Sequence, residues 1–326
     1  MVEQQGCMRV YYEITVTKKY NYRKGWRKMK YIDRNGNIEE VSTSQDQLLE
    51  KLYTSSLGRA FIKPFTSPVF SRILGALLNT RLSSCLIVPF VKTHNIQMDD
   101  YKSTFYQSYN EFFSREIKPE KRPIDSEIAS IISPADGKLS VYPISDDLHI
   151  RIKHTTYSIA SLLKSEQLAS QYEGGYAVVV RLTVDNYHRY CYVADGQKGK
   201  NHYIKGILHT VNPIANDYVP IYKENAREFC RIRTKHFGEI IQMEVGAMMV
   251  GKITNYHHRK QVSKGEEKGK FEFGGSTVVL LVKKDKVEFD TDLLENTKNG
   301  YETIIKMGER IGYRKAKEDA VKFFTL

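Results

Sequence analysis

The sequence predicts an α+β protein with a helical N-terminal part and a β-rich C-terminal domain. Apolar residues recur at helical spacing between residues 44 and 118. After residue 119, β-branched runs alternate with Gly, Asp and Asn, as strands and turns do. The chain has 326 residues, of which 41% are hydrophobic, and this is enough for a full core. Disordered and disulfide-scaffold classes are therefore excluded.

The first segment, residues 1–43, is predicted to be a basic extension with short strands. Residues 9–32 alternate apolar and basic side chains, and this period of two indicates strands. The Asn35-Gly36 pair marks a turn. A nucleic-acid surface has the same basic and aromatic character. An exposed basic hairpin is the simpler interpretation, and we expect no nucleic-acid partner.

Residues 44–118 are predicted to form an amphipathic helical region. Ser44 is a typical N-cap for a helix that extends to about residue 62. Farther along, Val69 begins a pattern with a spacing of four residues, which is the spacing of one helix face. A further helix is expected from Asp99 to Ile117. Its apolar stripe would consist of Tyr101, Phe105, Tyr109, Phe112 and Phe113.

The charge pattern of this helical region suits a membrane surface. No acidic residue occurs between Glu50 and Asp99. The basic residues of that stretch are Lys51, Arg59, Lys63, Arg72, Arg81 and Lys92. A region that is apolar on one side and cationic on the other suits anionic lipid, although a helical subdomain packed on a core shows the same pattern. No run reaches the roughly 18 apolar residues that a membrane span needs, so we expect a peripheral attachment.

Residues 119–326 are predicted to form the β-rich domain, with one or two helices. The helix expected there extends from Ser158 to Ala169. The four cysteines are scattered and form no CxxC pair, which argues against a structural zinc site and favours reduced thiols in a cytosolic setting.

Three short segments between predicted strands are candidates for chemistry. Asp136 lies in Ser-Pro-Ala-Asp-Gly, a pattern that more often marks a turn. His188 follows a strand and can act as a base, although most histidines in such places are structural. Gly274 and Gly275 precede Ser276 at the entrance of a strand. They leave the Gly275 carbonyl uncrowded, so that the Ser276 hydroxyl can attack it if a base is near; a β-bulge is the alternative.

Seven motifs then occur in one order. They are NEFFSREIKPEKRPID (110–125), SPADG (133–137), DNYHRY (185–190), VNPIA (211–215), EVGAMMVGKI (244–253), KGEEKGKFEFGGST (264–277) and YETIIKMGERIG (301–312). With them the sequence resembles the phosphatidylserine decarboxylases, a family of pyruvoyl-dependent decarboxylases. The resemblance extends from about Lys28 to Arg314.

The resemblance implies a zymogen that cuts itself between Gly275 and Ser276. The products would be a β chain, residues 1–275, and an α chain, residues 276–326. A relay of Asp136, His188 and Ser276 would activate the hydroxyl. Ser276 would become a pyruvoyl group that forms a Schiff base with phosphatidylserine and releases carbon dioxide, giving phosphatidylethanolamine. The resemblance thus implies a carboxy-lyase that needs no metal.

One departure from the family's pattern concerns the base. Many members read YHRxH, and here Cys191 stands in the second histidine position. Three interpretations stay open. His188 takes over as the base, or Cys191 acts itself with a lowered pKa. Otherwise another histidine, such as His209, His257 or His258, reaches the site.

The expected partners are phosphatidylserine in an anionic membrane and the two chains of the same precursor. The resemblance implies peripheral attachment at the cytoplasmic face. The oligomeric state is open, with a homodimer as one alternative. Two other functions are weighed: a pyruvoyl-dependent decarboxylase of a soluble amino acid, and a non-catalytic basic membrane-binding homologue.

Overall fold

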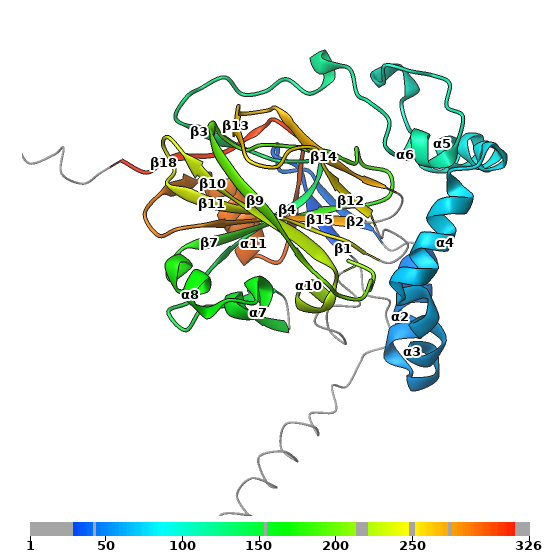
Figure 1. Cartoon of the computed structure of the whole chain (residues 1–326), viewed down its shortest axis with the longest axis horizontal. Helices are drawn as coiled ribbons and strands as arrows, with labels where there is room; N and C mark the ends of the chain where they lie inside the picture. The colour runs from blue at the N-terminus through cyan, green and yellow to red at the C-terminus, as the bar shows by residue number, and fades with distance from the viewer. Residues whose placement is uncertain are drawn as a thin grey trace, which may run out of the picture.

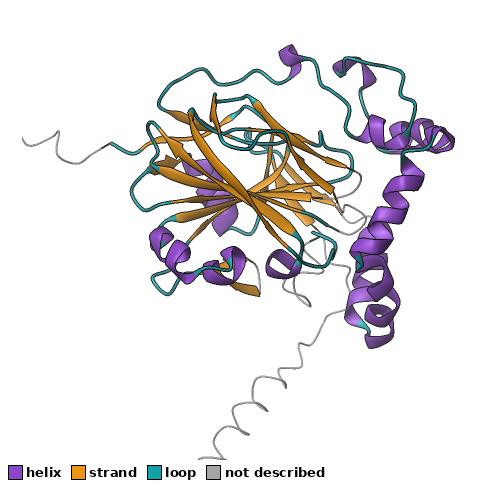
Figure 2. Cartoon of the chain, viewed as in Figure 1, coloured by secondary structure: helices purple, strands orange, loops and turns teal. Residues whose placement is uncertain are grey.

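The computed structural model describes residues 29–41, 44–152, 155–212, 221–247, 252–272 and 276–316. A column of helices stands beside a β-rich body, and the helices of the first part lie on one side of that body (Figures 1 and 2). The predicted α+β class is confirmed. Most of the predicted N-terminal extension, residues 1–28, lies outside the described residues, as does Gly275.

The column consists of short helices rather than long ones. In chain order they are α2 (Ser44–Thr54), α3 (Ser56–Ile62), η1 (Lys63–Thr66), α4 (Pro68–Leu78), η2 (Arg81–Leu86), α5 (Ile87–Thr93), η3 (Met98–Asp100), α6 (Tyr109–Phe113) and η4 (Pro119–Lys121). The helix predicted over residues 44–62 is interrupted because Ser55 is extended and caps α3, its side chain accepting a hydrogen bond from the Gly58 amide. Within the described residues no single helix is long and apolar enough to cross a membrane, but the bent pair Pro68–Leu78 and Arg81–Thr93 passes that test together.

The helix predicted from Asp99 to Ile117 is wrong. Tyr101 and Ile117 pair in an isolated β-bridge, and the Lys102 amide donates to the Glu116 carbonyl at 2.8 Å. Beyond η3, only α6 forms in this range, with the Ser108 side chain as its N-cap. The reason lies in Ser103. Its hydroxyl makes hydrogen bonds with both the amide and the carbonyl of Phe105, and these bonds compete with those of a helical turn.

The β body is built on one ten-stranded sheet in the order β13-β9-β10-β11-β15-β7-β4-β17-β1-β2. Smaller sheets, β12-β14-β8, β16-β18-β3 and β5-β6, pack around it. The strands are β1 (Met29–Ile32), β2 (Ile38–Val41), β3 (Ser130–Ile132), β4 (Gly137–Pro143), β5 (His149–Ile152), β6 (Thr155–Ser158), β7 (Tyr176–Leu182), β8 (Arg189–Cys191), β9 (Gly196–Ile204), β10 (Arg227–Thr234), β11 (Glu239–Val245), β12 (Lys252–Asn255), β13 (Lys260–Val262), β14 (Glu267–Glu272), β15 (Ser276–Val282), β16 (Val287–Phe289), β17 (Glu302–Ile305) and β18 (Arg310–Arg314).

Short helices cover the body. They are α7 (Ile159–Leu163), α8 (Glu166–Ala169), η5 (Ser170–Tyr172), α10 (Ile221–Glu224) and α11 (Thr291–Lys298). The helix predicted over Ser158–Ala169 is present as α7 and α8, broken at Lys164, whose φ of 54° is left-handed. Helix α11 was not predicted.

Strand β15 is the central element of the large sheet. All seven of its residues are buried, between antiparallel neighbours β11 and β7. Alternate residues face two cores. Val278 and Leu280 belong to the core shared with the sheet β12-β14-β8, whereas Val279 and Leu281 face the core that α7, α8 and α2 cover. A strand that is buried on both faces has a continuous run of apolar residues, and such a run predicted this strand from the sequence.

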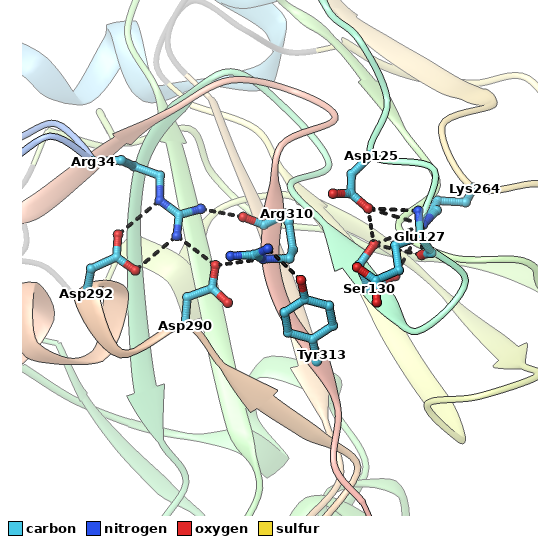
Figure 3. A network of polar contacts seen from close by, with 9 residues as sticks. All are labelled: Arg34, Asp125, Glu127, Ser130, Lys264, Asp290, Asp292, Arg310 and Tyr313. Atoms are coloured by element: carbon cyan, nitrogen blue, oxygen red, sulfur yellow. Dashed lines mark hydrogen bonds and ion pairs between the residues drawn. The ribbon is translucent and has the colours of Figure 1, made fainter.

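The strands predicted before residue 43 form a hairpin that joins the main sheet. β1 pairs with β2 through the Asn35-Gly36 turn and lies parallel to β17. Arg34 from this hairpin bonds both Asp290 and Asp292 at the start of α11 (Figure 3). The same network continues through Arg310. Residues 29–41 are thus part of the β body in space.

Candidate active site

Two connections between the large and the small sheet bring the predicted site segments to one place. Residues 183–188 lead from β7 to β8, and residues 273–275 join β14 to β15. Ser276 pairs with Leu182 at the end of β7, and the Phe271 amide donates to the His188 carbonyl at 2.9 Å. On the other side of β7, Lys138 of β4 pairs with Arg181. The segments of Asp136, His188 and Ser276 therefore meet at the same end of the sheet.

Ser276 lies inside the protein. It has no exposed surface, and its hydroxyl has no hydrogen-bond partner in the described part of the chain. Because Ser276 alternates with Thr277 and shares its face with Val278, it faces the core between the two sheets. A buried hydroxyl without a partner is costly to a fold, and such a group calls for a functional explanation.

His188 is also buried, with its ring against Phe113 at a centroid distance of 4.0 Å. Its Nδ1 lies 2.8 Å from the Asn186 carbonyl oxygen. A carbonyl only accepts, so this contact places the ring proton on Nδ1 and makes Nε2 the basic nitrogen. The tight turn over residues 183–186 builds this contact, since the Asn186 side chain accepts from the Thr183 amide.

Asp136 is held by an arginine that sequence reasoning did not single out. Arg122 approaches it with two nitrogens, and its Nε donates to Asp136 at 2.7 Å. The Met307 amide donates to the same carboxylate at 2.9 Å. Both side chains of the ion pair are largely buried. Burial works against the charge of Arg122, but the bonds to Asp136 outweigh it and raise the pKa of the guanidinium.

A second carboxylate interacts with His188. Burial opposes ionisation of Asp185, yet attraction by Lys138, hydrogen bonds and attraction by His188 together lower the pKa of Asp185. Asp185 is the first residue of the DNYHRY motif, so its place in the motif could have indicated it. Asp185 is thus an anion that interacts with His188, whereas the contacts of Asp136 are with Arg122 and the Met307 amide.

Cys191 lies where the family's second histidine would be, beside the Ser-Pro-Ala-Asp-Gly segment. Its amide donates to the Pro134 carbonyl at 2.8 Å, and its sulfur lies 3.8 Å from the Ser133 carbonyl oxygen. A thiolate role needs a lowered pKa, but burial raises the pKa of Cys191 to about 12. The thiol is therefore protonated at neutral pH.

The other histidines named from the sequence lie in different surroundings. His209 contacts the Tyr53 hydroxyl at 3.3 Å, where α2 meets the body. His257 contacts the Tyr192 hydroxyl at 3.2 Å, and the His258 carbonyl accepts from Lys198. Among the histidines named from the sequence, His188 lies on the connection that follows Leu182, the strand partner of Ser276.

A buried ion pair borders the same core, and the sequence did not reveal it. Lys268 donates to Glu244 at 2.6 Å, and both side chains are fully buried. Glu244 pairs with Val278, which puts it on the strand beside Ser276 and on the same face. Its other carboxylate oxygen has no partner in the described part of the chain. Burial raises the pKa of Glu244 even though Lys268 attracts its charge.

No cluster of three or more metal-binding side chains occurs among the described residues. The side chains at this place are the Ser276 hydroxyl, the His188 imidazole and buried carboxylates, with Arg122 and Lys268 as their cationic partners.

Comparisons with known proteins match this sequence to one family. A family profile described as phosphatidylserine decarboxylase matches residues 109–313. The chain is 46% identical over 265 residues to phosphatidylserine decarboxylase proenzyme 2 of Clostridium acetobutylicum, covering 81% of this chain and 91% of that protein. It is 38% identical over 293 residues to the phosphatidylserine decarboxylase proenzyme of Clostridium kluyveri, covering 88% and 99%. The chain belongs to the phosphatidylserine decarboxylase family.

Proposed function

We propose that this chain is a proenzyme that cuts itself at Ser276 and then decarboxylates phosphatidylserine to phosphatidylethanolamine. Membership of the family supports the reaction class, a carboxy-lyase. The residue assignment rests on the buried hydroxyl of Ser276 at the start of β15, unpartnered among the described residues, on the face towards the small sheet; the Thr277 hydroxyl is also buried and unpartnered there but faces the other core.

In the proposed processing step His188 Nε2 takes the hydroxyl proton of Ser276. The oxygen attacks the Gly275 carbonyl carbon, and the peptide C–N bond is exchanged for an ester. Loss of the Ser276 α-proton breaks the ester C–O bond and frees the carboxylate of residue 275. The dehydroalanine left at residue 276 then takes up water and loses ammonia, which yields the pyruvoyl group.

The two chains would stay together because the α chain supplies the middle of the sheet. β15 pairs with β11 and β7, which both belong to the β chain. The buried Arg181 donates to Glu302 at 2.6 Å across the same division. Arg34 adds its bonds to the α11 carboxylates (Figure 3). We expect the chains to separate only on unfolding.

In catalysis the pyruvoyl group would act as an electron sink. It would accept the electron pair of the C–C bond that breaks when carbon dioxide leaves. The side chains around residue 276 do the rest. His188 can return a proton to the product, since its Nδ1 contact keeps Nε2 basic. The apolar wall of Phe271 and Val278 excludes bulk water.

We also propose that the helical column docks on the membrane at the cytoplasmic face. Its exposed apolar side chains include Leu57 at 85%, Leu82 at 86% and Phe105 at 77% exposure. The same stretch carries basic residues and no acidic ones between Glu50 and Asp99. Apolar side chains open to solvent beside cations suit insertion into an anionic interface.

Intact mass of the purified protein tests the processing. The wild type is expected to give two chains, with the smaller one blocked at its N-terminus. Ser276→Ala should leave one chain of 37.7 kDa without activity. Thr277→Ala is the matched control, because its hydroxyl faces the opposite core, and it should be cut normally. A processed Ser276→Ala chain would show that the nucleophile is misassigned.

Flotation with anionic vesicles tests the docking. Leu57→Ser and Leu82→Ser together should weaken binding by more than tenfold, since each buried leucine is worth roughly 1.5–3 kcal/mol. Ile128→Ser is the control on the β body, where Ile128 is 72% exposed. Equal binding of all three proteins would count against insertion of the column.

A further inference from the structure

A polar cavity of about 460 Å³ lies between the column and the small sheet. This volume is in the range of small-molecule sites. Its lining includes Arg189, which follows His188, and Glu272, which ends β14. Ser114 and Arg115, which also line the cavity, directly follow Phe113, whose ring packs against His188 at 4.0 Å. The cavity therefore borders the side of the proposed site that holds His188.

One face of the small sheet supplies a group of charges to this cavity. Lys270 pairs with Arg189 in the sheet, and Lys252 pairs with Glu272. All four side chains line the cavity, on the side away from the buried Phe271. The opposite wall adds further charged residues from the segment around α6, which are Lys102, Arg115, Glu111 and Glu116.

Two of the lining residues carry buried polar atoms that the fold does not satisfy. Arg115 is 2% exposed, and its Nε has no partner in the described part of the chain. Asn110 is 4% exposed, and its Oδ1 is likewise without a partner there. The Lys270 side chain makes no hydrogen bond or ion pair within the described residues, whereas Lys252 bonds Glu272 at 2.7 Å. The Arg115 Nε and the Lys270 ammonium are donors that point to an anionic ligand, whereas Asn110 Oδ1 is an acceptor that suits an ammonium or hydroxyl group of the same ligand.

The cavity borders an apolar one. Tyr106 lines both, and the second cavity, of about 500 Å³, is lined by Ile87, Val88 and Phe105 among others. Phe105 and Val88 are exposed side chains of the proposed membrane face. A ligand that is charged at one end and apolar at the other would thus fit across Tyr106.

We propose that the polar cavity binds the head group of the phospholipid, with Lys270 and Arg115 as the main donors to its phosphate. This assignment rests on the proposed function and deepens it. The carboxylates of Glu116 and Glu272 are already paired with Lys102, Arg189 and Lys252, so the phosphate need not compete with them for Lys270. The apolar cavity beyond Tyr106 receives the glycerol end of the lipid.

The test is the KM for phosphatidylserine in neutral detergent micelles, where surface charge is removed from the assay. Lys270→Gln should raise KM about tenfold with kcat within twofold, since one charge-assisted bond is lost. The inhibition constant of glycerophosphoserine, the soluble head group, should rise by the same factor. Lys270→Arg should restore both within threefold. Lys298→Gln, an exposed lysine on α11, is the control and should change neither.

A second measurement separates this proposal from the proposed function. Titration of glycerophosphoserine into uncut Ser276→Ala protein reports the cavity without any pyruvoyl group, and Lys270→Gln in that background should abolish the binding. KM and inhibition constants within twofold of wild type would overturn the proposal. Inhibition by inorganic phosphate as strong as that by glycerophosphoserine would also overturn it. The same holds if Lys270→Gln weakens only the binding to phosphatidylglycerol vesicles.

Discussion

Removing Lys268 is expected to lower the free energy of unfolding by more than an exposed surface ion pair contributes to it. The Lys268–Glu244 contact is 2.6 Å, and both side chains are fully buried. Coulomb's law with an effective dielectric constant of 20 gives an attraction of about 6 kcal/mol at this distance. Desolvation offsets much of it, but removing one partner leaves a buried charge uncompensated. Lys268→Met should therefore lower the free energy of unfolding by about 3–5 kcal/mol at pH 7.5.

The pH dependence of this loss has a definite sign. Burial already raises the pKa of Glu244, and without Lys268 it rises further above the unfolded value of 4.5. The folded state then binds the proton more tightly than the unfolded state does. The penalty is therefore largest at neutral and higher pH, and it shrinks as the pH falls towards 4.5.

Urea unfolding of Ser276→Ala protein, followed by circular dichroism, measures the effect on one uncut chain. Lys268→Met with Glu244→Gln should recover most of the loss, since no buried charge is then left alone. Lys283→Met is the control, because Lys283 is partly exposed and lies 3.8 Å from its carboxylate partner. A cost below about 1 kcal/mol for Lys268→Met, or a double variant as unstable as the two single variants summed, would refute the reasoning.

Three further outcomes follow from the contacts of the site and the column. Arg122→Met should slow self-cleavage at least tenfold and destabilise the fold by about 3 kcal/mol, because Asp136 loses its buried partner; unchanged cleavage kinetics on gels would contradict this. Burial lowers the pKa of His209, so the docking of α2 should weaken as the pH falls below 6.5, with faster proteolysis of the column at pH 5.5 than at pH 7.5. Iodoacetamide at pH 8 should label the exposed Cys85 and spare Cys191 in the folded protein; equal labelling would disprove the protected thiol.

The sequence by itself determined the parts that depend on local pattern. The run from Ser276 to Val282 is continuous and β-branched, and it is a buried central strand. The motifs were sufficient to identify the family, because their order is a property of the chain alone. The expected helix after Asp99 failed, since Ser103 and the pairing of Tyr101 with Ile117 outweigh an apolar spacing.

Only the tertiary structure decided which side chains meet. Arg122 and Asp136 are close in sequence, but nothing in their spacing shows a two-nitrogen contact. Lys268 and Glu244 lie on different sheets, so their pairing depends on how β14 packs over β11. Hydrophobic periodicity indicates which face of an element is buried. The partner of a buried charge, in contrast, is decided only when the sheets pack against each other. The pair is then retained because an unpaired buried charge is costly.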